Sequence, residues 1–139
     1  MDTARLPFFV YGTLRPGGPN HDALLRGRVR AEEPARLHGA VLYEGPGYPY
    51  AVEAAGGTVH GEIVVPEPEA YAALLAALDR LEEYVPGDPR NLYDRVAGTA
   101  VRDADGASVR VWVYVAAPAV AARLRARGRR VESGNWPAR

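Results

Sequence analysis

Alternation of apolar and other residues is clearest toward the C-terminal end of the chain. Valine occupies every second position from 109 to 115, with serine before the first valine and arginine, tryptophan and tyrosine between the valines. This period of two is typical of a strand with one buried face. Residues 93–102 and 108–115 flank the turn-forming segment Asp103–Ala107, so we expect the two stretches to pair as a β-hairpin.

The N-terminal half predicts further strands, separated by glycine-rich segments. Residues 8–10 are apolar and run into a glycine-rich turn. Residues 35–43 form a second candidate strand, which ends at a segment with two glycines and a proline. Residues 51–54 and 58–65 are then predicted to form a hairpin with its turn at Gly56-Gly57.

One helix is clearly marked at both ends. It is predicted from about Glu67 or Pro68 to Tyr84, with prolines at its start and Pro86-Gly87 after its end. Apolar residues recur along it at the i, i+3, i+4, i+7 spacing of one buried stripe. They are Tyr71, Leu74, Leu75, Leu78, Leu81 and Val85.

Two shorter helices and a packed tail complete the expected elements. Asn20 is placed to cap a helix through residues 21–25, and Gly27 is placed to end it. A last helix is predicted over residues 118–127, ended by the glycine that follows. In the tail beyond it, Trp136 is expected to pack back onto the body.

The order and length of these elements favour one compact unit. The 139 residues are enough for a single domain with a substantial core, so we assign residues 1–139 to one domain. Many strands separated by short turns favour a mixed sheet or a small barrel over a doubly wound α/β fold.

Composition narrows the chemistry and the partners. Seventeen basic and seventeen acidic residues give a formal net charge of zero, which does not suggest binding to nucleic acid or to an anionic membrane. The absence of cysteine excludes disulfides, cysteine nucleophiles and thiolate metal sites. With no signal-like or membrane-length apolar run, we expect a cytoplasmic protein.

The stretch Phe8–Gly18 is the first candidate for chemistry. A short apolar run stops there in a glycine-rich turn, which would offer backbone N–H groups to an anion or a polarised carbonyl. The alternative is an ordinary N-terminal strand and turn.

Glu82 is the second candidate, because it lies on the wrong face of the main helix. On a wheel of roughly 100° per residue, it falls between Leu75 and Leu81 inside the apolar stripe. Asp79, Arg80 and Glu83 turn toward solvent on the same wheel.

Burial and the negative end of the helix dipole both disfavour a charged carboxylate at Glu82. Its pKa should therefore be raised toward neutrality, as a general acid/base requires. The alternative is that Glu82 reaches solvent or pairs with an arginine such as Arg95.

Other chemistries have weaker support. The spacing from Gly12 to Gly17 resembles a phosphate loop but lacks its Lys-Ser/Thr pair. Neither serine lies in a hydrolase elbow. His21, His38 and His60 are scattered without metal-ligand spacing, so no metal is expected.

Several other polar side chains have either a structural role or a role in binding substrate. Arg15 and Arg95 are more often solvated charges than carboxylate clamps. Four tyrosines in or beside loops are expected to pack half-buried, and one or two of them to line a pocket. They are Tyr48, Tyr50, Tyr84 and Tyr93.

Two motifs taken together resemble the gamma-glutamyl cyclotransferase-like superfamily. They are Phe9-Val10-Tyr11-Gly12-Thr13-Leu14-Arg15-Pro16-Gly17, and Leu78-Asp79-Arg80-Leu81-Glu82 followed by Tyr93-Asp94-Arg95-Val96. Intervening segments also match that family's order of elements, so the likeness covers nearly the whole chain. They are residues 37–43, 47–49 and 59–62.

The resemblance implies an α+β fold, with a small mixed β-barrel flanked by helices. It also implies a cofactor-independent enzyme of lyase or acyltransferase type, which converts a gamma-glutamyl amine or peptide to 5-oxoproline and a free amine. Glu82 matches the family's acid/base, and Tyr11, Gly12, Thr13 and Leu14 match its gamma-glutamyl-binding loop. Tyr48 and Tyr93 are added here as candidate substrate contacts.

The chain departs from the family pattern on one side of the expected pocket. Glu83 stands where many relatives have glycine, and the loop Tyr84–Leu92 is rather long, so the amine side of the substrate is expected to differ. Two other functions stay open: a non-catalytic module that binds a small ligand, and an amide-cleaving or acyl-transfer tailoring enzyme with another acyl group. The expected partner is a small molecule, and the expected state is a monomer or a homodimer.

Overall fold

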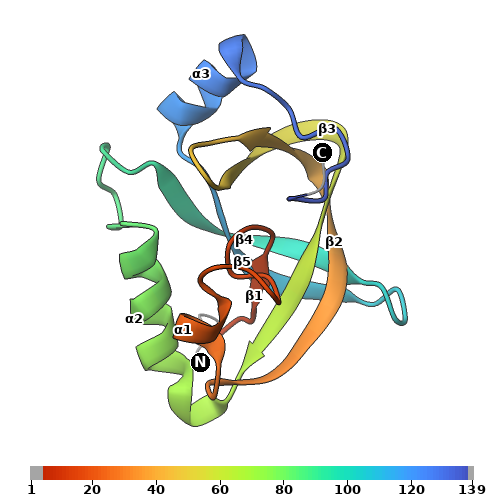
Figure 1. Cartoon of the computed structure of the whole chain (residues 1–139), viewed down its shortest axis with the longest axis vertical. Coiled ribbons are helices and arrows are strands. Elements are labelled where there is room, and N and C mark those ends of the chain that lie inside the picture. The colour runs from red at the N-terminus through yellow and green to blue at the C-terminus, as the bar shows by residue number, and fades with distance from the viewer. Residues whose placement is uncertain (1–4, 138–139) are drawn as a thin grey trace.

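A computed structural model describes residues 5–137 of the chain as a closed five-stranded barrel with helices around it (Figure 1). The elements follow one another in the order β1 Phe8–Val10, α1 His21–Leu25, β2 Val29–Glu44, β3 Pro49–Pro66, the 3₁₀ turn Pro68–Ala70, α2 Tyr71–Leu81, β4 Tyr93–Arg102, β5 Ser108–Ala116 and α3 Pro118–Arg127.

The barrel has the strand order β1-β3-β2-β4-β5 and closes through its shortest strand. β1 pairs antiparallel with β3, where Phe9 lies opposite Ile63, and parallel with β5, where Phe8 lies opposite Trp112. The predicted pairing of residues 93–102 with 108–115 is confirmed as the β4–β5 hairpin. The expected α+β barrel flanked by helices is therefore confirmed.

Strand alternation divides the core into two clusters. Successive side chains of a strand point to opposite faces, so the neighbours Phe8 and Phe9 of β1 lie in different clusters. The cluster of Phe9 takes residues from all five strands and fills the barrel interior, and Trp136 of the tail packs against it as expected. The cluster of Phe8 lies between the barrel and the helices, where Leu74 and Leu78 of α2 are fully buried.

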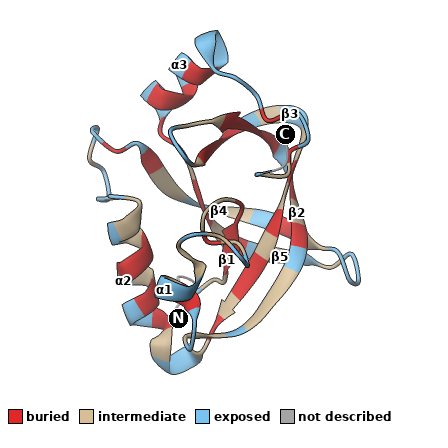
Figure 2. Cartoon of the chain, viewed as in Figure 1, coloured by how far each residue is buried: buried red, intermediate tan, exposed pale blue. Residues whose placement is uncertain are grey.

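The helices cover two separate regions of the barrel. Figure 1 shows α2 running alongside the barrel with α1 next to it, whereas α3 lies at the far end, over the tip of the β2–β3 hairpin. Buried positions recur along α2 in Figure 2, as its apolar stripe requires. None of the helices in residues 5–137 is long and apolar enough to cross a membrane.

The predicted hairpin at Gly56-Gly57 is wrong, because β3 runs through these glycines without turning. His38 of β2 pairs with Thr58, but Ala40 pairs with Glu53, so residues 54–57 form an irregular bulge in β3. A Cβ on Gly57 would lie 2.3 Å from the Ala40 carbonyl oxygen, so only glycine allows this approach of the two strands.

The turn between these long strands lies earlier, at residues 45–48. The Gly45 N–H donates to the Tyr48 carbonyl across it, over 2.8 Å. β2 also begins at Val29, six residues before its predicted start.

The main helix is shorter than predicted. α2 ends at Leu81, with Glu82 as its C-cap and Glu83 in the left-handed region at φ 54°. Val85 therefore lies beyond the helix and is 55% exposed rather than part of the buried stripe. The two shorter helices agree with expectation, except that the side chain of Asn20 does not cap α1.

Candidate active site

A cavity of about 290 Å³ lies between the loop after β1, the C-terminal end of α2 and the start of β4. Every residue that the sequence placed in a site lines it: Tyr11, Gly12, Thr13, Leu14, Tyr48, Glu82 and Tyr93. The sequence therefore identified which segments meet, and the roles of the individual residues remain predictions.

The loop after β1 forms one wall of the cavity as a tight turn. The Arg15 N–H donates to the Gly12 carbonyl, and the Asn20 N–H donates to the Thr13 carbonyl. The Asn20 side chain donates to the Thr13 hydroxyl over 2.9 Å, which explains why it does not cap α1. A Cβ on Gly12 would lie 3.0 Å from the Pro49 ring, so glycine lets the turn approach the start of β3.

Three backbone donors of this turn have no partner within the described part of the chain. Among the described residues, no group accepts a hydrogen bond from the N–H of Gly12, Thr13 or Leu14. All three residues line the cavity. Free N–H groups in a turn are suited to bind a carboxylate or a carbonyl oxygen, because they are preorganised partial positive charges.

Glu82 forms the opposite wall because of how α2 ends. The Glu83 N–H donates to the Arg80 carbonyl and the Tyr84 N–H to the Asp79 carbonyl, which is the Schellman pattern of a helix C-terminus. This ending leaves Glu82 on the cavity side of the last turn, beside Leu81.

The Glu82 carboxylate is half-buried and unpaired. Within residues 5–137, no hydrogen bond or ion pair to its side chain is formed. Loss of hydration raises its pKa to about 7. A carboxyl group with this pKa can accept and return a proton near neutral pH.

The alternative that Glu82 pairs with Arg95 is wrong. Arg95 Nε lies 2.9 Å from an oxygen of Asp79, which also accepts a hydrogen bond of 2.6 Å from the Tyr114 hydroxyl. The expectation that Asp79 turns to solvent is also wrong, because the helical wheel does not include the strands packed against the helix. Arg95 is therefore engaged one helical turn away from the candidate acid/base.

Four tyrosines also line the cavity, and the hydroxyls of Tyr11 and Tyr93 are engaged by other parts of the fold. The Tyr11 hydroxyl donates to the Tyr114 carbonyl and accepts from the Ala51 N–H. The Tyr93 hydroxyl donates to the Pro49 carbonyl over 2.7 Å. Burial raises the pKa of both phenols far above neutrality, so they stay protonated and present ring surface rather than charge.

An aromatic stack continues from Tyr93 toward the cavity mouth. The Tyr93 and Tyr50 rings stack with centroids 4.6 Å apart, and Tyr48 meets Tyr50 edge to face at 5.7 Å. Tyr48 is half-buried and lines the cavity, whereas Tyr50 does not. The pair Tyr48 and Tyr93 could hold the aliphatic part of a substrate between the two polar walls.

Sequence reasoning missed Tyr114 and Asn20 as lining residues. Tyr114 lies in β5 between two valines, and the alternation places it on the face opposite the barrel interior without saying what covers that face. The pairing of Arg95 with Tyr114 across the β4–β5 hairpin was the available signal, because Arg95 belongs to the second motif.

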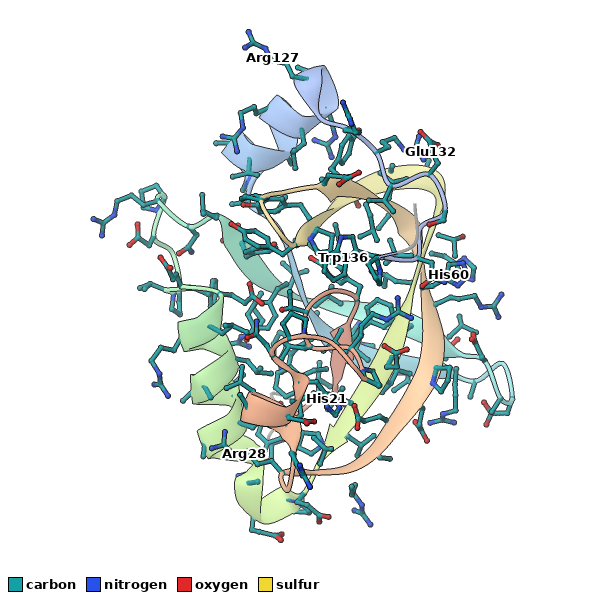
Figure 3. All side chains as sticks on the ribbon, in the orientation of Figure 1. His21, Arg28, His60, Arg127, Glu132 and Trp136 are labelled. Atoms are coloured by element: carbon teal, nitrogen blue, oxygen red, sulfur yellow. The ribbon has the colours of Figure 1, made fainter. Side chains whose placement is uncertain are left out.

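Arg15 does not line the cavity, and its guanidinium is engaged by other groups. Arg15 binds both oxygens of Glu62 and also reaches Asn135 and the Trp136 carbonyl of the tail, so it is not a solvated charge. Figure 3 shows Trp136 against the barrel, and Arg127 pointing away from it at the end of α3. No group of three metal-ligating side chains exists among residues 5–137.

Comparison with known proteins identifies a family that matches nearly the whole chain. A sequence profile of the family described as gamma-glutamyl cyclotransferase, AIG2-like, matches residues 8–138. The gamma-L-glutamyl-butirosin B gamma-glutamyl cyclotransferase of Niallia circulans is 36% identical over 109 residues, which are 77% of this chain and 64% of that protein. The chain thus spans somewhat less than two thirds of that relative.

Solved structures share the fold. An AIG2-like protein from Mus musculus is 26% identical with a TM-score of 0.58, over 82% of this chain and 80% of that one. A protein of Arabidopsis thaliana is 28% identical with a TM-score of 0.60, over 84% of this chain and 72% of that one. By its sequence profile and its barrel, this chain belongs to the gamma-glutamyl cyclotransferase, AIG2-like family.

Proposed function

We propose that this protein converts a gamma-glutamyl amine to 5-oxoproline and the free amine, with Glu82 as general acid/base. The observation that carries the proposal is the pairing of two walls across one cavity. Glu82 brings an unpaired carboxylate with a pKa of about 7, and the turn at residues 12–14 brings free backbone N–H groups. Membership of the family supports the same reaction.

The turn and the tyrosines would hold the gamma-glutamyl group. Backbone N–H groups of Gly12, Thr13 and Leu14 bind its oxygen atoms, and the rings of Tyr48 and Tyr93 pack against its methylene groups. A fixed substrate favours ring closure, because the attacking amine and the carbonyl belong to one molecule.

Glu82 then moves one proton. Its carboxylate takes a proton from the α-ammonium of the substrate, and the neutral amine attacks the γ-carbonyl carbon to form the C–N bond of the lactam. The N–H groups of the turn stabilise the oxyanion that develops on the carbonyl oxygen. When the original C–N bond breaks, protonated Glu82 donates its proton to the departing nitrogen, and the ring nitrogen loses its second proton through solvent to the released amine, which leaves as an ammonium ion. The Glu82 carboxylate is then back in its starting state.

The amine portion lies toward the end of α2. The relative from Niallia circulans is named for gamma-L-glutamyl-butirosin B, so this gamma-glutamyl compound is one candidate substrate. The cavity is bounded on that side by Glu83 and Leu92, both of them exposed.

The test is product identification with matched variants. Wild type, Glu82→Gln and Glu69→Gln are incubated with gamma-glutamyl amines, gamma-glutamyl dipeptides and gamma-L-glutamyl-butirosin B, and 5-oxoproline is measured. Glu69 is an exposed acidic residue just before α2 and outside the cavity, so its variant controls for loss of one negative charge.

We expect Glu82→Gln to lose at least about 100-fold of the wild-type rate, the usual scale of general acid/base catalysis, and Glu69→Gln to keep it. Undiminished turnover in Glu82→Gln would refute the assignment. Glutamate, or an intact acyl transfer, in place of 5-oxoproline would favour the tailoring enzyme. Ligand binding without product would favour the binding module.

A further inference from the structure

Arg95 is bound one helical turn before the candidate catalytic carboxylate, through its ion pair with Asp79 of α2. It lies two residues after Tyr93 on β4, so both side chains project from the same face of the sheet. Its partner across the β4–β5 hairpin is Tyr114. Tyr93 and Tyr114 both line the cavity that contains Glu82, and Arg95 does not.

The guanidinium of Arg95 is held outside the cavity by several groups at once. Nε and Nη2 lie 2.9 and 3.4 Å from the two oxygens of Asp79. The guanidinium carbon lies 4.5 Å from the centre of the Trp112 ring and 5.4 Å from that of Tyr84. This ion pair is well shielded, with side chains of Arg95 and Asp79 only 15% and 22% exposed.

Asp79 and Glu82 are alternative partners for the same cation. They are three residues apart at the end of α2, which places them on neighbouring positions of one helix face. A guanidinium matches the geometry of either carboxylate. In the structure, Arg95 and the Tyr114 hydroxyl are both bound to Asp79, and Glu82 is left without a partner.

We propose that Asp79 is a positioning residue, which holds Arg95 against Trp112 and so keeps the Glu82 carboxylate unpaired and available for proton transfer. This inference rests on the proposed function. A guanidinium beside a carboxylate lowers its pKa by 1–3 units, which would leave Glu82 too weak a base near neutral pH.

The other groups around Glu82 do not compete for this role. Arg80 of α2 and Glu83 just after that helix are both exposed, and Arg123 of α3 acts on Tyr50. The remaining neighbours are phenols whose pKa is raised by burial, so they are neutral at working pH: Tyr11, Tyr50, Tyr93 and Tyr114.

The experiment compares the pH dependence of kcat/KM among variants of the full chain. In wild type, the acid limb should have its midpoint near pH 7, the pKa of Glu82. Asp79→Asn removes the charge that holds Arg95, so the guanidinium moves to Glu82. We expect the midpoint to fall by at least about one pH unit and the maximal kcat to fall about tenfold, with KM little changed.

The double variant Asp79→Asn/Arg95→Gln separates this mechanism from simple damage to the fold. It lacks the displaced cation, so its acid limb should return to the wild-type midpoint. Tyr114→Phe removes only the second hydrogen bond to Asp79, so it should leave the midpoint in place. An unchanged midpoint in Asp79→Asn, or a double variant that stays shifted, would overturn the inference.

Two further measurements keep the inference testable. If Asp79→Asn fails to fold, the double variant decides, since it lacks both charges: its midpoint should equal that of wild type, and an upward shift would show that Arg95 already acts on Glu82 in the native protein. If wild type forms no 5-oxoproline, the proposed function fails. The ionisation of Glu82, followed by NMR of carboxyl-labelled glutamate in wild type and Asp79→Asn, then tests the placement of Arg95 without any activity.

Discussion

At the scale of single residues, Glu82 is held in a state that costs stability. An unfolded chain ionises this group near its ordinary pKa of 4.5, whereas burial raises the pKa to about 7 in the fold. Between these pH values the folded protein keeps a proton that the unfolded chain has lost. The free energy of unfolding therefore falls as the pH rises through this range, and the whole cost is present above pH 7.

Replacing Glu82 with glutamine should therefore stabilise the protein in a pH-dependent way. We expect the unfolding free energy of Glu82→Gln to exceed that of wild type by roughly 2 kcal/mol at pH 8 and by less than about 1 kcal/mol at pH 5. Urea unfolding at the two pH values measures this. Glu69→Gln, an exposed site, should show no such pH-dependent gain, and a gain in Glu82→Gln that is equal at both pH values would contradict the raised pKa.

The sequence predicted this residue well and its surroundings less well. The position of Glu82 follows from the helical repeat alone, since an acidic residue inside an apolar stripe is visible without any tertiary information. The ion pair of Arg95 with Asp79 could not be predicted from the helical repeat, because Arg95 and Tyr114 come from two strands that lie later in the chain and pack against the helix. The resemblance to the family supplied the link between Glu82 and the turn after β1.

At the scale of elements, the end of α2 carries local strain. Glu83 adopts the left-handed conformation at φ 54°, which a Schellman ending requires and which favours glycine. A residue with a Cβ pays roughly 1–2 kcal/mol there. Glycine at position 83 is thus what this backbone would prefer on stability alone.

Glu83→Gly should consequently stabilise the chain, after allowance for the greater freedom of glycine when unfolded. We expect a gain of about 1 kcal/mol over wild type, and no gain for Glu83→Ala, which keeps the Cβ. Chemical denaturation of the three proteins compares them directly. Equal stability of the glycine and alanine variants would show that the backbone at this position is not strained.

The bulge in β3 requires glycine at position 57. Gly57→Ala would place a Cβ 2.3 Å from the Ala40 carbonyl oxygen, and the two long strands would have to separate. We expect a loss of about 3 kcal/mol of unfolding free energy. Gly98→Ala in β4 is the matched control, since its Cβ would meet the nearest atom, in Val113, at 3.6 Å and should cost little. A similar effect of both substitutions would contradict the close approach at Gly57.

This bulge also shows where local sequence signals are ambiguous. Two glycines between β-forming stretches are compatible with a hairpin turn and with a bulge in one continuous strand. The pairing of β3 with β2 decides between these two structures. His38 and Ala40 of β2 pair with Thr58 and Glu53, which are five positions apart in β3. No local pattern contains that information.

At the scale of the whole molecule, Arg15 connects the substrate turn to the C-terminal tail. It binds Glu62 of β3 with two hydrogen bonds and the tail at Asn135 and the Trp136 carbonyl, each over 2.6 Å. It also follows directly on the cavity-lining turn, through its N–H to Gly12. The end of the chain thus supports the first loop of the fold.

Arg15→Met should destabilise both the loop after β1 and the C-terminal tail, because Arg15 contacts the two of them. Loss of a partly buried partner for Glu62 is expected to cost about 2 kcal/mol, and trypsin should cleave after Arg130 faster than in wild type. Arg36→Met is the control, because its pair with Asp103 is 39% and 44% exposed and should be worth less than about 1 kcal/mol. Unchanged proteolysis of the tail in Arg15→Met would mean that the tail is held by other contacts.

The closure of the barrel is the part of the fold that local patterns could not specify. β1 has three residues and joins β3 to β5 through pairings that span more than fifty and one hundred positions. Strand alternation predicted most of the strands. It did not distinguish between a mixed sheet and a barrel. The resemblance to the family distinguished them, because it carries long-range pairing that no window of the sequence contains.

The rate of 5-oxoproline formation as a function of pH, for wild type and Glu82→Gln, tests the central claim most directly. For wild type we expect kcat/KM to rise with pH through a midpoint near 7, because only the Glu82 carboxylate can accept the substrate's proton. Glu82→Gln should be at least about 100-fold slower and should lack that limb. A glutamine variant that turns over at the wild-type rate, or a wild-type midpoint near the ordinary glutamate pKa of 4.5, would contradict the account.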